Sequence, residues 1–304
     1  MMRKRLYVDF MGNKKWLFIL SGVVLAIGIA AIIVRGLTFG IEFRGGTVIY
    51  LKDAQKVTTE QVRKALEAAD LEGARNANIQ PTDEGGYIVR LAEPDADRAN
   101  AAFAEVVSAL KLPVQEKDVT TIGPGWGRNI TDKALLALMV SIIAILLYIS
   151  VRFEYKMSVT AVVALVHDAL IVLGIYALSG REITPNTFAA LLTILGYSLY
   201  DTIVVFHRIR ENTQRLVKQS FMRMANDSIN QVLVRSINTS LTAIIPMATL
   251  FFFGGETLRD FAFALLVGLI SGAYSSVAVA SPIYAIWKET EPRYQALKKR
   301  YGSA

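Results

Sequence analysis

Six long apolar runs alternate with polar stretches along the chain, and the longest polar stretch separates the first run from the other five. Each run has roughly the twenty residues that a helix needs to cross the hydrocarbon core of a bilayer. The runs cover residues 16–34, 132–151, 157–178, 187–206, 237–253 and 261–287. The pattern predicts an α-helical polytopic membrane protein. The first run is too long for a signal peptide and is interpreted as an uncleaved helix.

Lysine and arginine mark one side of the predicted membrane, because short cytoplasmic loops carry an excess of these residues. The basic residues of the predicted cytoplasmic loops and termini are Arg3, Lys4, Arg5, Lys14, Lys15, Arg152, Lys156, Arg208, Arg210, Arg215, Lys218, Arg223, Arg235, Lys288, Arg293, Lys298, Lys299 and Arg300. The opposite short loops contain only Arg181 and Arg259. Both termini are therefore expected in the cytoplasm. The net charge of +7 reflects this orientation, not nucleic-acid binding.

The spans predict a division of the chain into five parts. These are a cytoplasmic N-terminus at 1–15, transmembrane helix 1 at 16–37, an extracytoplasmic domain at 38–127, transmembrane helices 2–6 at 128–287 with a cytoplasmic amphipathic loop at 207–236, and a cytoplasmic tail at 288–304. The amphipathic loop could lie along the inner membrane surface or pack as an ordinary helix under the bundle.

The extracytoplasmic domain shows short strand and helix patterns in the order β-α-β-β-α-β. The strands are expected at 41–52, 76–81, 85–92 and 114–123, and the helices at 58–70 and 95–111. This order is typical of the ferredoxin-like α+β fold, with a two-layer arrangement of sheet and helices. The glycines of 123–127 are interpreted as a hinge into the next membrane helix. A fold of this kind names no function by itself.

Motifs for catalysis are missing. The chain has no cysteine and two histidines, and it contains neither H-E-x-x-H nor a phosphate-binding G-x-x-x-x-G-K-[ST] loop. We therefore expect no enzyme, no metal and no cofactor, and the polar residues inside the membrane become the candidate functional groups.

Asp201 is the clearest of these residues, because it stands inside an apolar run. At a rise of ~1.5 Å per residue it lies ~21 Å from the outer end of its helix. A charge at a helix centre costs roughly 2.5–3.5 kcal/mol on insertion scales, so such residues usually mark ion or proton pathways. The alternative is a structural carboxylate bonded by Tyr197, Ser198 or a neighbouring helix.

Asp168 is the second candidate, ~16 Å into the preceding helix. His167 beside it projects about 100° away along a helix, so the two side chains need not share a face. A proton relay and a structural bond to another helix are equally favoured here. His207 is interpreted as a solvated residue at the cytoplasmic mouth.

The fifth run begins with polar residues and contains a proline. Arg235 either snorkels to the cytoplasmic interface or pairs with Asp201 when that carboxyl is ionised. Thr239 would offer exchangeable hydrogen bonds nearby, and Pro246 would permit flexure. In the last run, small residues recur at every fourth position, which favours close helix packing. These residues are Gly268, Gly272, Ser276 and Ala280.

Three stretches together resemble the SecF family of bacterial protein-export membrane subunits. They are FGIEFRGGT at 39–47, GYSLYDTIVVFHRIREN at 196–212 and RSINTSLT at 235–242. The resemblance covers nearly the whole chain. The family more often has Asn in place of Tyr200 and Asp in place of His207, so the resemblance assigns those two residues no role.

The resemblance implies half of a resistance-nodulation-division-type bundle in the bacterial inner membrane. The implied partners are SecD, the SecYEG translocon, YajC, YidC and the exported unfolded polypeptide, and the implied energy source is the proton-motive force. Asp201 would then carry protons, with Arg235 and Thr239 coupled to it. A motif at the base of the outer domain would comprise Gly40, Glu42, Arg44, Gly45 and Gly46.

Two other functions stay open at this stage. A proton-coupled exporter of small molecules would share the architecture, although the outer domain is small for a substrate pocket. A passive assembly factor would use its polar residues only to hold helices together, and it would work without a proton gradient.

Overall fold

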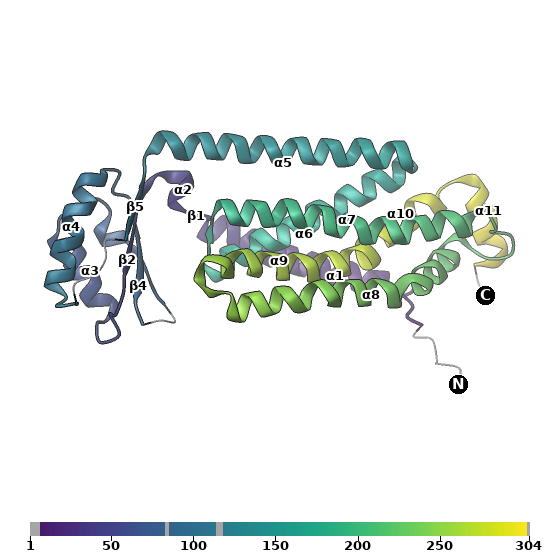
Figure 1. Cartoon of the computed structure of the whole chain (residues 1–304). Helices are drawn as coiled ribbons and strands as arrows, with labels where there is room; N and C mark the ends of the chain where they lie inside the picture. The colour runs from purple at the N-terminus through teal and green to yellow at the C-terminus, as the bar shows by residue number, and fades with distance from the viewer. Residues whose placement is uncertain (1–6, 83–84, 114–117, 303–304) are drawn as a thin grey trace. The chain divides into compact units, whose positions relative to one another are not determined.

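A computed structural model describes residues 7–82, 85–113 and 118–302 of the chain (Figure 1). The chain forms two compact units. Unit 1 is helical and contains the residues up to Leu37, Leu138–Arg181 and the residues from Asn186 on. Unit 2 contains Thr38–Ala137 and, separately, the short segment Glu182–Pro185.

Long helices make up unit 1. They are α1 (Lys14–Arg35), α5 (Pro124–Arg152, which begins in unit 2), α6 (Tyr155–Ser179), α7 (Pro185–Thr213), α8 (Phe221–Phe253), α9 (Gly255–Ser275), α10 (Ser281–Glu289) and α11 (Pro292–Tyr301). Five amino acids of π-helix, Ser276–Ala280, join α9 to α10. Within the described residues, six stretches are long and apolar enough to cross a membrane. Each contains one of the six predicted apolar runs, so that prediction is confirmed.

Most of the stretch predicted as an amphipathic loop, 207–236, belongs to the two helices that flank it, in line with the packed-helix alternative. The α7 helix continues to Thr213, and α8 begins at Phe221, whose N-cap Ser220 accepts a hydrogen bond from the backbone N–H of Arg223. Only seven residues, 214–220, separate the two helices. Apolar residues of this stretch, among them Leu216, Phe221 and Ile229, are buried in the core of the helical unit, and its second part forms the N-terminal half of α8.

Backbone hydrogen bonds attach the N-terminal arm, residues 7–13, to this half of α8. The side-chain oxygen of Asn226 accepts from the N–H of Phe10 at 2.9 Å, and Asn230 accepts from the N–H of Val8 at 2.7 Å. The Asn230 amide also donates to the carbonyl of Val8 at 2.8 Å. These amides replace the strand or helix partners that the arm lacks.

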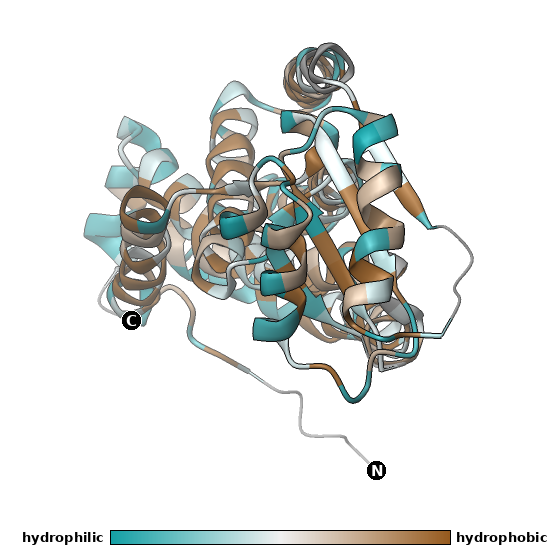
Figure 2. Cartoon of the chain, turned by 90° about the vertical axis from the view of Figure 1, so that its left-hand side faces the viewer, coloured by the Kyte–Doolittle hydropathy of each residue, from teal (hydrophilic) through white to brown (hydrophobic). Residues whose placement is uncertain are grey.

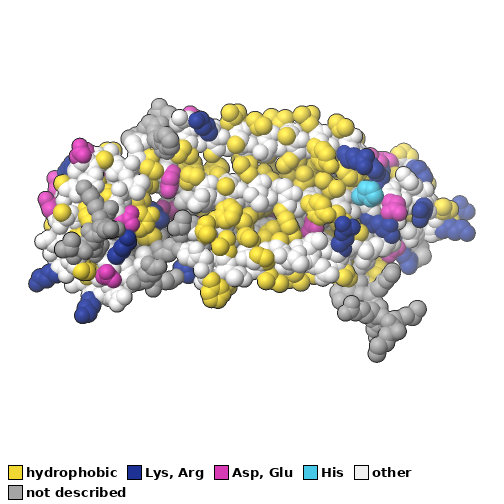
Figure 3. Space-filling model, in the orientation of Figure 1, with side chains coloured by type: hydrophobic (Ala, Val, Ile, Leu, Met, Phe, Trp, Pro, Cys, Tyr) yellow, Lys and Arg dark blue, Asp and Glu magenta, His cyan; other side chains and the backbone are white. Residues whose placement is uncertain are grey.

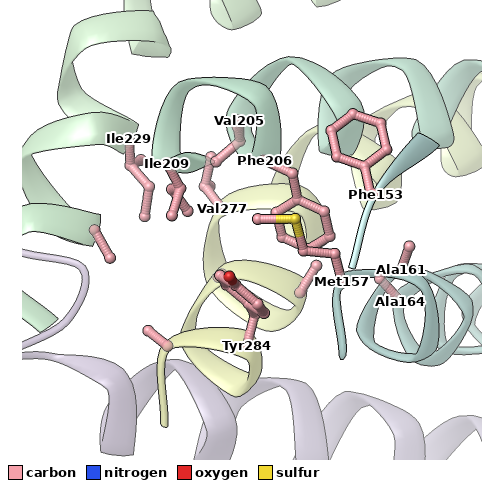
Figure 4. Close-up of a cluster of buried hydrophobic side chains, with 14 of the residues drawn as sticks. Phe153, Met157, Ala161, Ala164, Val205, Phe206, Ile209, Ile229, Val277 and Tyr284 are labelled. Atoms are coloured by element: carbon pink, nitrogen blue, oxygen red, sulfur yellow. The ribbon is translucent and has the colours of Figure 1, made fainter. Parts of the chain in front are cut away.

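The core of the helical unit lies where α6, α7, α8 and α10 meet (Figure 4). Met157, Phe206 and Tyr284 are fully buried there.

Apolar side chains also cover the outside of the unit, and Lys and Arg gather at one of its ends (Figure 3). At that end Lys156 pairs with Glu291 at 2.9 Å. Burial raises the pKa of Glu291, but hydrogen bonds from Lys156 and Lys288 outweigh burial and hold this pKa below its usual value.

Glycine permits close helix contacts at two places in unit 1. A Cβ atom on Gly174 of α6 would lie 2.6 Å from the Cα of Gly28 on α1. A Cβ on Gly272 of α9 would lie 2.8 Å from the Cβ of Ser198 on α7. The contact of Gly272 with Ser198 and the burial of Gly268 against Ile194 agree with the prediction that the small-residue stripe serves internal packing.

Unit 2 is built on a four-stranded antiparallel sheet with the strand order β3-β4-β2-β5. Its elements are β2 (Gly46–Leu51), α3 (Thr59–Ala68), the 3-10 turn η1 (Ala74–Asn76), β3 (Asn78–Pro81), β4 (Tyr87–Leu91), α4 (Ala96–Ala109) and β5 (Val119–Ile122). Thr58 and Gln61 form a capping box at the start of α3. Figure 2 shows hydrophobic strands behind two helices whose sides turned to the viewer are largely hydrophilic.

Both faces of this sheet are covered. On one face α3 and α4 pack against Ile49, Leu51 and Val89. On the other face a smaller cluster joins Ile88 to Ile41 of the short helix α2 (Ile41–Arg44). A separate two-stranded parallel sheet pairs β1 (Thr38–Phe39) with β6 (Glu182–Ile183).

Two local predictions in this unit are wrong. The strand expected from residue 41 begins only at Gly46, because α2 and the left-handed Gly45 (φ 79°) precede it. The glycines of 123–127 form no hinge loop: β5 ends at Ile122 and α5 starts at Pro124. Proline suits the first position of a helix, where its missing N–H has no partner to lose. Part of the last predicted strand, 114–117, lies outside the described residues.

Gly46 is required by its backbone. Its φ is 133°, and a Cβ would lie 2.4 Å from the carbonyl oxygen of Leu91. We expect Gly46→Ala to lower the free energy of unfolding by about 1–3 kcal/mol, as forced backbone strain does. Thermal unfolding in detergent measures this. The matched control is Gly22→Ala on α1, where a Cβ meets nothing within 4 Å; equal unfolding temperatures for both variants would contradict the assignment.

Candidate functional site

Asp201 lies in the middle of α7 and is 2% exposed. Its carboxylate accepts a hydrogen bond from the hydroxyl of Ser240 on α8 at 3.2 Å. The side chains of Ser236 and Thr239, on the same helix, face the same carboxylate. In the part of the chain that the structure describes, no lysine, arginine or histidine pairs with Asp201. Among the described residues, the side chains that hydrogen-bond or face this buried carboxyl are therefore hydroxyl-bearing ones.

A hydrogen bond from Tyr197 holds α7 to α8 beside Asp201. The Tyr197 hydroxyl donates to the carbonyl oxygen of Thr239 at 2.8 Å. The Thr239 hydroxyl itself donates within α8, to the carbonyl of Ser236 at 2.9 Å. Tyr197 and Ser198, expected as bonding partners of Asp201, bond to other groups; the neighbouring helix supplies the partner.

Arg235 is exposed and makes no ion pair with Asp201 among the described residues. Its carbonyl oxygen accepts the hydroxyl of Thr239 at 3.1 Å. His207 is exposed as well, in line with the solvated position expected for it.

Asp168 on α6 sits in a compact cage of serine hydroxyl groups and is fully buried. Ser198 of α7 donates to one carboxylate oxygen at 2.7 Å. Ser271 and Ser275 of α9 donate at 2.6 and 2.8 Å. One carboxyl group thus joins α6, α7 and α9 by three short hydrogen bonds.

His167 also contacts this carboxylate, contrary to what the angular separation suggested. Its Nδ1 lies 3.1 Å from Oδ1 of Asp168. The ring stacks on Tyr274 with centroids 6.4 Å apart, and its buried Nε2 atom has no hydrogen-bond partner among the described residues. The Tyr274 hydroxyl donates to the carbonyl of Leu17 on α1 at 2.9 Å.

The two buried carboxyls are linked through α7. Ser198, which binds Asp168, and Asp201 are three positions apart, so they are neighbours on one side of the helix. Thr202 extends the same polar seam by bonding Ser276 of the π-helical segment at 2.9 Å. The serines of α9 were missed in the sequence; their signal is the i, i+4 spacing of Ser271 and Ser275, each one position before a member of the stripe of small residues.

The motif from Gly40 to Gly46 shapes the backbone of unit 2. Gly40 caps α2, and Gly45 and Gly46 take left-handed φ values. The guanidinium of Arg44 lies 5.9 Å from the ring centroid of Phe39, while Glu42 is half-buried. These contacts lie within unit 2, which contains the whole motif. Asp168 and Asp201 belong to unit 1.

A buried carboxylate in unit 2, that of Glu182, was also missed in the sequence. Glu182 of β6 pairs with Arg90 of β4 at 3.1 Å and accepts a hydrogen bond from the amide of Asn78 on β3. It is 6% exposed. A two-residue strand gives no periodic pattern, so only the isolated Glu in an outer loop could have drawn attention to it.

No group of three or more His, Asp or Glu side chains within the described residues could hold a metal ion. The polar groups of the site are carboxyls, hydroxyls and one imidazole, all in the bundle. The chain is thus a polytopic membrane protein with two buried carboxyls inside its helices, Asp168 and Asp201.

Comparison with known proteins gives the family. Residues 102–290 match the family described as Protein export membrane protein SecD/SecF, C-terminal, and residues 30–52 match the SecD/SecF GG Motif. The chain is 39% identical over 300 residues to Protein translocase subunit SecF of Streptomyces coelicolor, covering 96% of this chain and 80% of that protein. It is 40% identical over 285 residues to SecF of Thermodesulfovibrio yellowstonii, covering 91% and 93%. The chain belongs to the SecF branch of the SecD/SecF family.

Solved structures agree with this assignment. The crystal structure of SecDF, a translocon-associated membrane protein from Thermus thermophilus, matches with a TM-score of 0.87 at 35% identity. It covers 95% of this chain, which spans only 40% of the SecDF chain. SecDF in its super-membrane-facing form matches with a TM-score of 0.72 at 34% identity, over 100% of this chain and 41% of that one.

The serine cage predicts a large cost for losing its acceptor. Asp168→Ala should lower the free energy of unfolding by at least ~1–3 kcal/mol, because buried donors are left unpaired. Asp168→Asn keeps an acceptor oxygen, so it should lower the free energy of unfolding much less than Asp168→Ala does. Thermal unfolding of the two purified variants compares them; equal destabilisation would show that the hydroxyl bonds do not depend on the oxygen at this position.

Proposed function

We propose that this protein assists protein translocation across the bacterial cytoplasmic membrane, using the proton-motive force together with a SecD partner and the SecYEG translocon. The relatives named SecF and SecDF support the translocation part of this proposal. In SecDF of Thermus thermophilus and Bacillus subtilis, the matching region is about 40% of a longer chain, which supports a SecD-like partner for this one.

Asp201 carries the proton in this proposal. The observation behind it is a carboxyl buried at the centre of a membrane helix with hydroxyl partners only. Such a group can hold a proton as a neutral acid, or lose it and accept more hydrogen bonds from Ser240 and its neighbours. The two states differ in how strongly α7 is drawn to α8, so each proton taken up or released biases the packing of these helices.

Arg235 and Thr239 act on this step differently. Thr239 belongs to the bonded contact between the helices, through Tyr197. Arg235 is exposed and makes no ion pair with Asp201 among the described residues, so we assign such a pairing to the ionised state of the cycle. Asp168, with all its donors in place, is better suited to anchor α7 to α6 and α9 than to relay protons.

Unit 2 is assigned to the extracytoplasmic side. Its element order, with strand order β3-β4-β2-β5, fits the ferredoxin-like fold. The excess of lysine and arginine in the opposite loops, such as 152–156 and 208–223, supports this orientation and cytoplasmic termini. In that position the unit can contact an exported chain as it leaves the translocon.

Replacing the proton carrier tests the proposal. Asp201→Asn keeps the size and hydrogen bonding of the side chain but cannot exchange a proton. We expect it to abolish the proton-gradient-dependent part of export, measured in membrane vesicles that contain SecYEG, SecD and this subunit, and to leave the ATP-driven part unchanged.

Asp168→Asn is the matched control, since it makes the same change at the other buried carboxyl. It should retain most of the stimulation. Adding an uncoupler should reduce wild-type export to the Asp201→Asn level. Export by Asp201→Asn that still responds to the gradient would exclude Asp201 as the carrier, and wild-type export that ignores the uncoupler would favour a passive assembly factor.

A further inference from the structure

The segment between α6 and α7 belongs to unit 2 although both flanking helices belong to unit 1. The chain enters unit 2 at Glu182 and leaves it after Pro185, the first residue of α7. This segment therefore joins the helix that carries Asp201 directly to the strand-containing unit.

Its attachment differs from that of α1 and α5. The chain passes from α1 through β1 and α2 into β2, and from β5 through Gly123 into α5, so both connections continue covalently into the four-stranded sheet. The segment 182–185 contributes no strand to that sheet. Only non-covalent contacts hold it in unit 2.

Backbone contacts supply the first part of this attachment. In the parallel pair of β1 and β6, Thr38 is opposite Glu182 and Phe39 is opposite Ile183. The N–H of Gly40 also donates to the carbonyl of Ile183 at 2.9 Å. Two-stranded pairings are marginal on their own, and this one is only two residues long on each side.

Side chains supply the second part. Arg90 of β4 lies directly opposite Asn78 of β3 in the antiparallel register. Both reach the carboxylate of Glu182, Arg90 through its Nε at 3.1 Å and Asn78 through its amide. Gln80 binds the remaining end of the Arg90 guanidinium at 3.0 Å. Glu182 is thus bound by two strands of the main sheet while its backbone pairs with a strand of the small sheet.

The burial of this ion pair makes it costly in free energy to separate segment 182–185 from the sheet. Glu182 is 6% exposed, and the side chain of Arg90 is 19% exposed. A desolvated carboxylate depends on its cationic and amide partners, because the apolar groups around it offer no hydrogen bonds. Separation of the segment from the sheet would leave both charges without partners until water reached them.

We propose that Glu182, Arg90 and Asn78 form a clamp that transmits movement of α7 to unit 2, so that they are positioning residues for proton-driven export. The inference rests on the proposed role of Asp201. Asp201 lies ~24 Å along α7 from Pro185, and a helix of this length moves as a rigid element. A shift of α7 at Asp201 then displaces Glu182 and, through the clamp, the edge of the sheet formed by β3 and β4.

The experiment weakens the clamp and then restores it by a covalent bond. Glu182→Ala removes the contacts to both strands. Phe39→Cys with Ile183→Cys places two thiols at opposite positions of β1 and β6, in a subunit that has no cysteine of its own. Export is measured in vesicles with SecD and SecYEG, with and without a proton gradient, for the oxidised and the reduced protein.

We expect Glu182→Ala to reduce the gradient-dependent part of export severalfold at unchanged ATP-driven export. Oxidation of the cysteine pair in the Glu182→Ala background should restore most of it, and reduction should remove it again. A residue that only stabilised the fold would lower both parts of export together. Asp70→Asn is the matched control, because it breaks an exposed ion pair with Arg98 elsewhere in the same unit.

Three results would overturn the clamp: gradient-dependent export by Glu182→Ala equal to wild type, no recovery on oxidation, or loss of export when the cysteine pair is oxidised in an otherwise unchanged protein. If Glu182→Ala accumulates poorly, Glu182→Gln provides the same comparison with the side-chain size retained. Asp201→Asn is measured in parallel. Normal stimulation in Asp201→Asn rejects the proposed function itself, whereas loss there with normal Glu182→Ala rejects only the clamp.

Discussion

The bundle depends on hydrogen bonds to carboxylates that no solvent reaches. Lipid offers no donors, so each charged oxygen inside the helices must be satisfied by another helix. Asp168 meets this requirement with serines from α7 and α9, and Asp201 meets it with Ser240 of α8. These bonds fix which faces of α6, α7, α8 and α9 meet, and glycine at position 272 lets α7 and α9 come close enough to make them.

The contrast between the two carboxyls follows from how many donors each has. Asp168 has three serine donors and a histidine, and a change in its charge would disturb three helices at once. Asp201 has a single bond within hydrogen-bonding distance, with further hydroxyls nearby. A sparsely bonded carboxyl can change its protonation at a lower cost, which is the physical reason to assign the proton to Asp201 and the anchoring role to Asp168.

The apolar runs and the two carboxyls were predictable because their signals are long or unusual in composition. A span of twenty apolar residues is read from length alone, and an aspartate inside it stands out. The partners were not predictable, since serine is common in membrane helices and the rotation of each helix about its axis is set only by packing. For the same reason the sequence left open whether Arg235 snorkels to the interface or pairs with Asp201; in the structure it is exposed and makes no ion pair with Asp201 among the described residues. Short elements were not predicted either, because α2 has four residues and β6 has two, too few to show a periodic pattern.

The N-terminal arm has a consequence for how the chain is made. Val8 and Phe10 are hydrogen-bonded to Asn230 and Asn226, which are 222 and 216 positions later in the sequence. During synthesis the arm is complete long before the ribosome reaches α8, so its backbone has no asparagine partners until that helix has been made. The arm and α8 are therefore joined late, after α1, α5, α6, α7 and the whole four-stranded sheet have been synthesised.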